Sequence, residues 1–226
     1  MKAFPIDARA MNPRTLRTTV AGPAGVIECA IDHAPQGSTR GVAVLCHPHP
    51  LHGGTLDNKV VQTLARSLVQ LGYTSVRFNF RGIGASQGSW DEGRGEVDDA
   101  LAVVAAQRLP GLPLVLGGFS FGAYVATQAA ARLGSDAPAE RVLLVGPAVL
   151  NFALAAVPVD TLVVHGELDE VVPLTAVFDW ARTQTLPVVV VPGSGHFFHG
   201  QLALLKQIVL GAFAPRSAHA PQTETP

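Results

Sequence analysis

The sequence has 226 residues, of which 48% are hydrophobic and 15% charged, and this composition excludes an intrinsically disordered chain. A chain of this length can bury roughly 70% of the surface that its unfolded form exposes, so it needs no disulfide or metal to hold a core. The 16 basic and 17 acidic residues leave a formal net charge of −1 with no basic cluster, which excludes a nucleic-acid partner.

The first residues and the two cysteines indicate the compartment. Met1–Leu16 contains no continuous apolar run, so it is not a signal peptide, and no later stretch is long and apolar enough to span a bilayer. Cys29 and Cys46 are expected to be reduced and buried, with a single disulfide between them as the alternative. We therefore expect a cytoplasmic protein with no membrane partner; its oligomeric state stays open.

Short β-rich apolar runs alternate with longer helical patterns, which indicates an α/β fold with a mostly parallel sheet and helices on both faces. In chain order we expect strands at Thr18–Ala21, Val26–Ile31 and Gly41–Cys46, a helix at Asn58–Leu71, a strand at Thr74–Phe80, a helix at Glu96–Gln107, a strand at Leu112–Gly117, a helix at Phe121–Leu133, strands at Arg141–Val145 and Asp160–Val164, a helix at Pro173–Thr183, a strand at Pro187–Val191 and a helix at His199–Phe213. The first two strands flank a Gly-Pro-Ala-Gly turn and predict an antiparallel hairpin at the sheet edge. The pattern predicts one domain over residues 1–213 with seven or eight strands, and a disordered tail over residues 214–226.

A glycine-rich pentapeptide with Ser120 at its centre, Gly118–Gly122, matches the G-x-S-x-G pattern of a nucleophile elbow. It stands between an expected strand and the expected helix Phe121–Leu133, which is the setting that the pattern requires. At the start of a helix, the backbone N–H of Phe121 has no partner within the helix and can donate to an anion. The alternative is that Ser120 only caps the helix. The flanking elements favour a nucleophile.

A serine hydroxyl is a weak nucleophile at neutral pH, and it needs a base that is oriented by a further group. In hydrolases with this elbow, the order along the chain is serine, then Asp or Glu, then His. The loop after the strand Asp160–Val164 carries three carboxylates, Glu167, Asp169 and Glu170. After the strand Pro187–Val191, His196 ends a short glycine-rich loop, whereas His199 begins the final helix. His196 is therefore the predicted base.

These motifs resemble those of the α/β-hydrolase superfamily over nearly the whole chain. Within it, the chain is similar to small lidless enzymes of the dienelactone hydrolase and short-chain acyl esterase group. The segments that carry the resemblance are His47–Lys59, Arg77–Gly88, the Ser120 pentapeptide and the two downstream loops. The resemblance implies that Asp169, from its place in His-Gly-x-x-Asp-x-x-Val-Pro, is the acid that orients His196. Dienelactone hydrolases use a cysteine where this chain has Ser120, which argues against lactone chemistry.

The tetrahedral intermediate of acyl transfer needs two hydrogen-bond donors on its oxygen. The backbone N–H of Phe121 is one candidate. The resemblance places the other in the loop after the strand Gly41–Cys46, where Pro48 has no N–H to donate. The backbone N–H of His49 is therefore the predicted second donor.

The same loop supports a different hypothesis, because His47, His49 and His52 are spaced as in the metal loop of metallo-hydrolases. In such loops an Asp usually precedes the last His, whereas this chain has Leu51, and no matching His and Asp spacing follows downstream. We therefore expect no metal and no other cofactor. The histidines are expected to form hydrogen bonds within the loop.

The short segment Gly146–Val159 lies where many members of the superfamily insert a cap, so no lid is expected. The sequence predicts a hydrolase that cleaves a carboxylic ester or thioester through an acyl-enzyme on Ser120. Four phenylalanines near the predicted triad are expected to line an apolar acyl pocket, with a core position as the alternative for the first: Phe119, Phe121, Phe197 and Phe198. A peptidase or acyltransferase with the same triad is the alternative, because a triad does not specify the acyl donor. A non-catalytic binding protein is disfavoured by the intact Ser, Asp and His.

Overall fold

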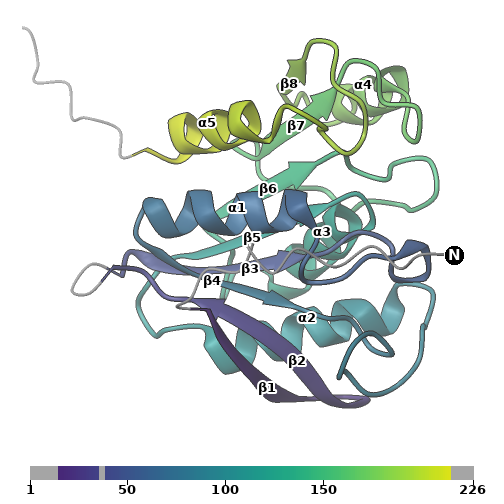
Figure 1. The fold of residues 1–226 in the computed structure, drawn as a ribbon. Helices are drawn as coiled ribbons and strands as arrows, with labels where there is room; N and C mark the ends of the chain where they lie inside the picture. Colours follow the sequence, from purple (N-terminus) through teal and green to yellow (C-terminus); the bar gives the residue numbers. More distant parts are fainter. Residues whose placement is uncertain (1–14, 36–38, 215–226) are drawn as a thin grey trace, which may run out of the picture.

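An eight-stranded sheet organises the chain (Figure 1). The computed structural model describes residues 15–35 and 39–214. The strands are β1 Leu16–Gly22, β2 Gly25–Asp32, β3 Gly41–Cys46, β4 Tyr73–Phe78, β5 Leu114–Phe119, β6 Arg141–Val145, β7 Leu162–Gly166 and β8 Val188–Val191. They lie in the order β1-β2-β4-β3-β5-β6-β7-β8, and each neighbouring pair from β4 to β8 is parallel. The predicted mostly parallel sheet is confirmed.

The antiparallel part of the sheet lies at one edge. β1 and β2 form the predicted hairpin, with Leu16 opposite Ile31 and Gly22 opposite Gly25. β2 is also antiparallel to β4, so the hairpin is joined to the parallel strands through β4. This junction matters for the site, because β2 and β4 carry the polar side chains that hold the loop after β3.

Helices cover both faces of the sheet (Figure 1). In the described residues they are α1 Lys59–Gln70, α2 Arg94–Gln107, α3 Phe121–Leu133, α4 Leu174–Arg182 and α5 Leu202–Phe213. α1 and α5 pack against each other and share one core cluster, to which Leu64 and Leu205 belong. α2 and α3 pack against each other in the second cluster, together with Val177 of α4. The sheet therefore separates two cores.

Helix α1 shows how the sequence determines an element. Its apolar residues recur at helical spacing and are buried: Val60, Val61, Leu64 and Leu68. Asn58 caps the helix, since its side-chain oxygen accepts hydrogen bonds from the N–H groups of Val60 (2.9 Å) and Val61 (3.3 Å). The predicted range Asn58–Leu71 differs from the helix only by its two capping residues.

Several predicted boundaries differ from the structure; for example, β5 and β7 begin and end two residues later than predicted. Two of the differences have a clear local reason. α5 begins at Leu202 and not at His199, because Phe198 and Gly200 have φ angles of 52° and 75°, which an α-helix cannot contain. β4 ends at Phe78 and not at Phe80, whose N–H donates to the side chain of His47 and not to a neighbouring strand.

The connection between β6 and β7 contains no inserted lid. Residues 146–161 are all described, and none of them lies in a helix or strand. No helix in the ranges 15–35 and 39–214 has the length and apolarity needed to cross a membrane. Of the predicted tail, only Ala214 is described, and the rest lies outside the described residues.

Both cysteines are free and buried, as predicted. Burial raises the pKa of the Cys29 thiol to about 12, and it raises the pKa of Cys46 further still. Because the thiolate is the reactive form, neither cysteine is a nucleophile at neutral pH.

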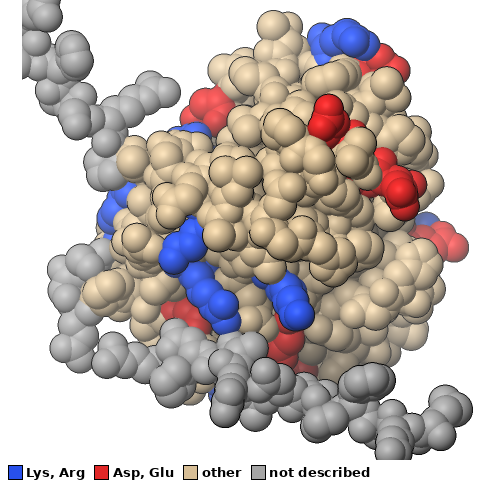
Figure 2. Space-filling view, turned by 45° about the horizontal axis from the view of Figure 1, so that its top comes forward, with Lys and Arg blue, Asp and Glu red and all other residues tan. Residues whose placement is uncertain are grey.

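Charged side chains are dispersed on the face of the molecule shown in Figure 2, in keeping with the net charge of −1. Exposed ion pairs such as Arg132 with Asp98 contribute about 1 kcal/mol or less each. Among the arginine–carboxylate pairs of the described residues, Arg77 with Asp32 is buried and Arg81 with Asp99 is largely buried.

Candidate active site

Ser120 lies on a strained turn between β5 and α3. Its φ and ψ angles are 57° and −117°, in a region that residues other than glycine rarely adopt. Glycine is required on both sides of it: a Cβ on Gly118 would lie 2.1 Å from the carbonyl oxygen of Gly122, and a Cβ on Gly122 would lie 2.2 Å from that of Cys46. The G-x-S-x-G pattern thus reflects the close approach of α3 to both β5 and β3.

A buried acid–base pair stands at the ends of β7 and β8. His196 Nδ1 lies 2.7 Å from Asp169 Oδ2. Asp169 Oδ1 accepts hydrogen bonds from the N–H groups of Val171 (2.9 Å) and Val172 (2.7 Å). Although burial alone raises the pKa of Asp169, the hydrogen bonds from His196 and Val172 lower it below its ordinary value. Asp169 is therefore ionised, and His196 Nδ1 carries the proton between them.

The other carboxylates of this loop have different surroundings. Glu167 is exposed, and its Oε2 accepts a hydrogen bond from the N–H of Gly193 (2.8 Å), which ties the two loops together. Glu170 is exposed as well. His199 is exposed and lies beside Phe197. The structure thus brings Asp169 and His196 together.

One cavity of about 260 Å³ connects the serine to the histidine. Its wall is formed by Pro48, His49, His52, Gly53, Gly54, Asn58, Ser120, Val171, His196 and Phe197. The His196 ring is fixed by Phe119, whose ring centroid lies 4.9 Å away. Within the described residues, Ser120 Oγ makes no hydrogen bond with His196. Such bonds between nucleophile and base are often formed only when substrate is bound.

The segment that contains His49 forms another part of the cavity wall. The His49 ring is packed among aromatic rings, at 4.7 Å from Trp90, 5.2 Å from Phe121 and 4.4 Å from His52. In the described part of the chain, no acceptor is found for the backbone N–H of His49 or for that of Phe121. Both predicted oxyanion donors therefore have an N–H without an acceptor in the described residues, and the side-chain rings of the two residues pack together, with their centroids 5.2 Å apart.

His47 holds the loop after β3 in place through hydrogen bonds. His47 is fully buried, its Nε2 accepts a hydrogen bond from the N–H of Phe80 (3.1 Å), and its Nδ1 donates to the carbonyl of Pro48 (2.6 Å). Burial lowers its pKa to about 4, so the ring is neutral with both nitrogens engaged. Across the described ranges, no group of three His, Cys, Asp or Glu residues is placed to hold a metal ion. The loop geometry thus gives the metal hypothesis no support.

His165 is a buried polar group that the sequence interpretation missed. Its Nε2 donates to the carbonyl of Val172 (2.8 Å) and lies 3.4 Å from Asp169 Oδ2. Its Nδ1 is buried and has no partner among the described residues. Burial lowers its pKa, so the ring is neutral and faces the ionised Asp169 with an N–H. The available signal was its position at the end of β7, four residues before Asp169.

The expectation for the phenylalanines is largely wrong. Phe119, Phe121 and Phe198 are fully buried in the two cores and do not belong to the cavity wall. Only Phe197 lines the cavity, and it is 47% exposed. The apolar lining is therefore smaller than predicted, although the core alternative for Phe119 was correct.

The eight-stranded sheet with its antiparallel edge, its strained serine turn after β5 and its short β6–β7 connection defines the chain as an α/β hydrolase without a lid. It belongs to the family described as serine aminopeptidase, S33, whose model matches residues 38–157.

Solved structures support this assignment. A protein of Xanthomonas campestris, described as an α/β serine hydrolase without lid, is 38% identical with a TM-score of 0.81, over 92% of this chain and 98% of that one. An α/β serine hydrolase homologue from Coxiella burnetii is 39% identical with a TM-score of 0.78, over 92% of this chain and all of the other. An uncharacterised protein of Rickettsia prowazekii is 35% identical over 194 residues, which is 78% of this chain and 79% of that protein.

Replacing His165 tests whether it holds the loop of Asp169. His165→Leu leaves the buried carbonyl of Val172 without its donor, so we expect the free energy of unfolding to fall by about 1–3 kcal/mol. His165→Gln keeps an N–H near the position of Nε2, and it should recover part of this loss. Urea denaturation of the three proteins measures the effect; equal losses in both variants would contradict the role of the N–H.

The low pKa of His47 predicts a pH dependence of stability. Because the folded pKa of about 4 lies below that of the unfolded chain, the unfolded state binds the proton first. The contribution of the neutral His47 ring to the free energy of unfolding is complete above about pH 6.5. As the pH falls towards 4, up to about 3 kcal/mol of it is lost. Urea denaturation at pH 7 and at pH 4.5 should show a smaller loss for His47→Gln than for the wild type. Parallel losses would show that His47 is not the group responsible.

Proposed function

We propose that the protein is a serine hydrolase that cleaves carboxylic esters or thioesters through an acyl-enzyme on Ser120. The observation that carries the proposal is the single cavity whose wall contains both Ser120 and His196, with Asp169 bonded behind the imidazole. The family assignment supports hydrolase chemistry. Since burial keeps both thiols protonated, Ser120 is the nucleophile that fits the site.

The geometry supports a two-step mechanism. Ser120 Oγ attacks the carbonyl carbon while His196 Nε2 takes its proton, and Asp169 stabilises the imidazolium that forms. The backbone N–H groups of Phe121 and His49 donate to the oxyanion. Collapse of the intermediate breaks the bond to the alcohol or thiol, which leaves with the proton from His196. Water then attacks the acyl group by the same steps and frees Ser120.

Ser120→Ala tests the nucleophile. Removing the covalent step should reduce ester turnover by several orders of magnitude. The folded state should be preserved, because the Oγ makes no hydrogen bond in the described part of the chain. A fluorophosphonate probe should label the wild type at Ser120 and leave the variant unlabelled. Labelling or turnover that survives in the variant would contradict the proposal.

An aminopeptidase is the alternative that the family name raises. Such an enzyme must bind the substrate's ammonium group, but no acidic side chain lines the cavity with Ser120. An adjoining cavity of about 410 Å³, which shares His196 in its wall, is lined by one acidic side chain, that of Glu170. Aminoacyl p-nitroanilides assayed beside p-nitrophenyl esters separate the two activities, and we expect the esters to react faster.

The small cavity predicts a preference for short acyl chains. Each buried methylene contributes about 0.8 kcal/mol, or roughly fourfold in kcat/KM, while the walls can cover it. A cavity of about 260 Å³ is smaller than a typical ligand pocket. Over a series of p-nitrophenyl esters, kcat/KM should rise over the first few carbons and then level off, without a jump at the micelle concentration. A continued rise to long chains would contradict an open, short site.

A further inference from the structure

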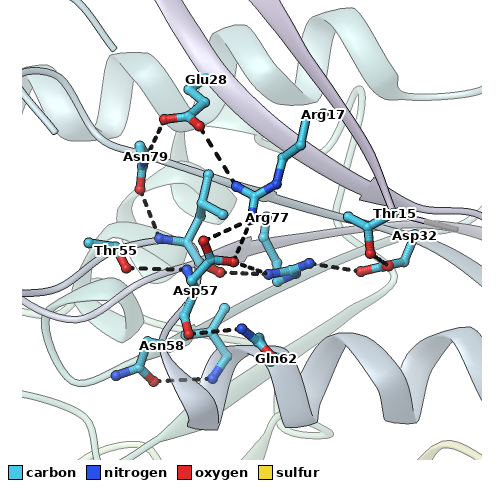
Figure 3. Close-up of polar contacts among 12 residues, drawn as sticks. Thr15, Arg17, Glu28, Asp32, Thr55, Asp57, Asn58, Gln62, Arg77 and Asn79 are labelled. Carbon is cyan, nitrogen blue, oxygen red and sulfur yellow. Dashed lines mark hydrogen bonds and ion pairs between the residues drawn. The ribbon is translucent and has the colours of Figure 1, made fainter. Parts of the chain in front are cut away.

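A buried polar network fixes the segment that leads into α1 (Figure 3). Arg77 on β4 is 5% exposed, and it donates to the carbonyl of Leu56 (2.8 Å) and to Asp32 Oδ2 on β2 (3.0 Å). Asn79 Oδ1 accepts a hydrogen bond from the N–H of Leu56 (2.8 Å). Both polar groups of the Leu56 backbone are thus held by side chains that extend from the strand β4 and the residue after it.

The next residues are fixed equally well. The Asp57 carboxylate accepts hydrogen bonds from Arg17, at 2.7 Å on each oxygen, and from Arg77 (3.3 Å). The Asp57 carbonyl accepts one from Gln62 Nε2 (2.9 Å). The N–H of Asn58 donates to the carbonyl of Thr55 (3.0 Å). Hydrogen bonds therefore fix the backbone at Asn58, the residue that caps α1.

The cap determines which way the Asn58 amide faces. Its Oδ1 accepts from the N–H groups of Val60 and Val61, and an amide nitrogen cannot take that role. Nδ2 must therefore point away from the helix, as Figure 3 shows. No acceptor for Nδ2 is found within residues 15–35 and 39–214. Asn58 also belongs to the wall of the cavity that contains Ser120 and His196.

We propose that Asn58 Nδ2 is a specificity-determining donor that binds an oxygen of the substrate close to the scissile carbonyl. The inference rests on the proposed ester or thioester hydrolysis. The substrates that this donor would select are esters or thioesters with a neutral oxygen acceptor, such as a hydroxyl, ether or keto group, within a few atoms of the reacting carbon. A neutral acceptor fits because the cavity wall contains neither Lys or Arg nor Asp or Glu. Serine or aspartate would cap α1 equally well, but asparagine adds an N–H donor that is separate from the capping oxygen.

The test compares esters of equal size in the wild type, Asn58→Ser and Asn58→Asp. Both variants keep a side-chain oxygen that caps α1, and thermal melts check that they remain folded. p-Nitrophenyl methoxyacetate is paired with p-nitrophenyl butyrate for an oxygen on the acyl side. 2-Methoxyethyl butyrate is paired with butyl butyrate for an oxygen on the leaving side. The intrinsic reactivity of each ester cancels when the kcat/KM ratio within a pair is compared between proteins.

We expect the ratio of oxygenated to plain ester to fall roughly tenfold in both variants for one of the two pairs, since one hydrogen bond is lost. A purely structural role of Asn58 would lower both members of a pair together and leave the ratio unchanged. Ratios unchanged in both pairs, with esters still hydrolysed, overturn the role of Asn58 alone. A wild type that hydrolyses none of the four esters overturns the proposed function itself.

Discussion

The close approach of α3 to the end of β3 is the contact on which the candidate site depends. It is possible only because Gly122 has no side chain: a Cβ there would lie 2.2 Å from the carbonyl of Cys46 and 2.6 Å from that of His47. The same approach places Ser120 on its strained turn. It also brings the start of α3 beside the loop after β3, where the rings of His49 and Phe121 are 5.2 Å apart. One packing constraint thus joins the turn that carries Ser120 to the loop that carries His49.

Buried polar side chains then hold the loops that complete the cavity. On one side, His165 and the N–H groups of Val171 and Val172 surround Asp169, so the carboxylate stays ionised although it is buried. On the other side, Arg77 and Asn79 hold the backbone that leads to Asn58. Leaving a buried polar group without a hydrogen-bond partner costs more free energy than one such hydrogen bond contributes. Each network therefore favours the one loop conformation in which its groups are paired.

The sequence predicts the elements best where a local pattern decides them. β3, β6 and α3 have the predicted boundaries, because apolar runs bounded by Gly, Pro or polar residues leave little choice. The start of α5 was missed because the positive φ angles of Phe198 and Gly200 follow from how this turn packs, not from propensity. The position of His165 beside Asp169 and that of Asn58 beside Ser120 arise from tertiary packing. In the sequence, the first looks like a residue of a strand and the second like a helix cap.

Because the chain has no lid, its candidate site depends on loops held by packing and hydrogen bonds. Enzymes with a lid exclude water by closing it, and closure also completes the arrangement of donors. Here residues 146–161 supply no such element, and Val171 and Phe197 at the cavity wall are 52% and 47% exposed. An open site in contact with water gains most from donors that need no reorganisation when charge develops. The packed His49 ring and the His47 hydrogen bonds, which fix the loop from both sides, meet that requirement without any moving part.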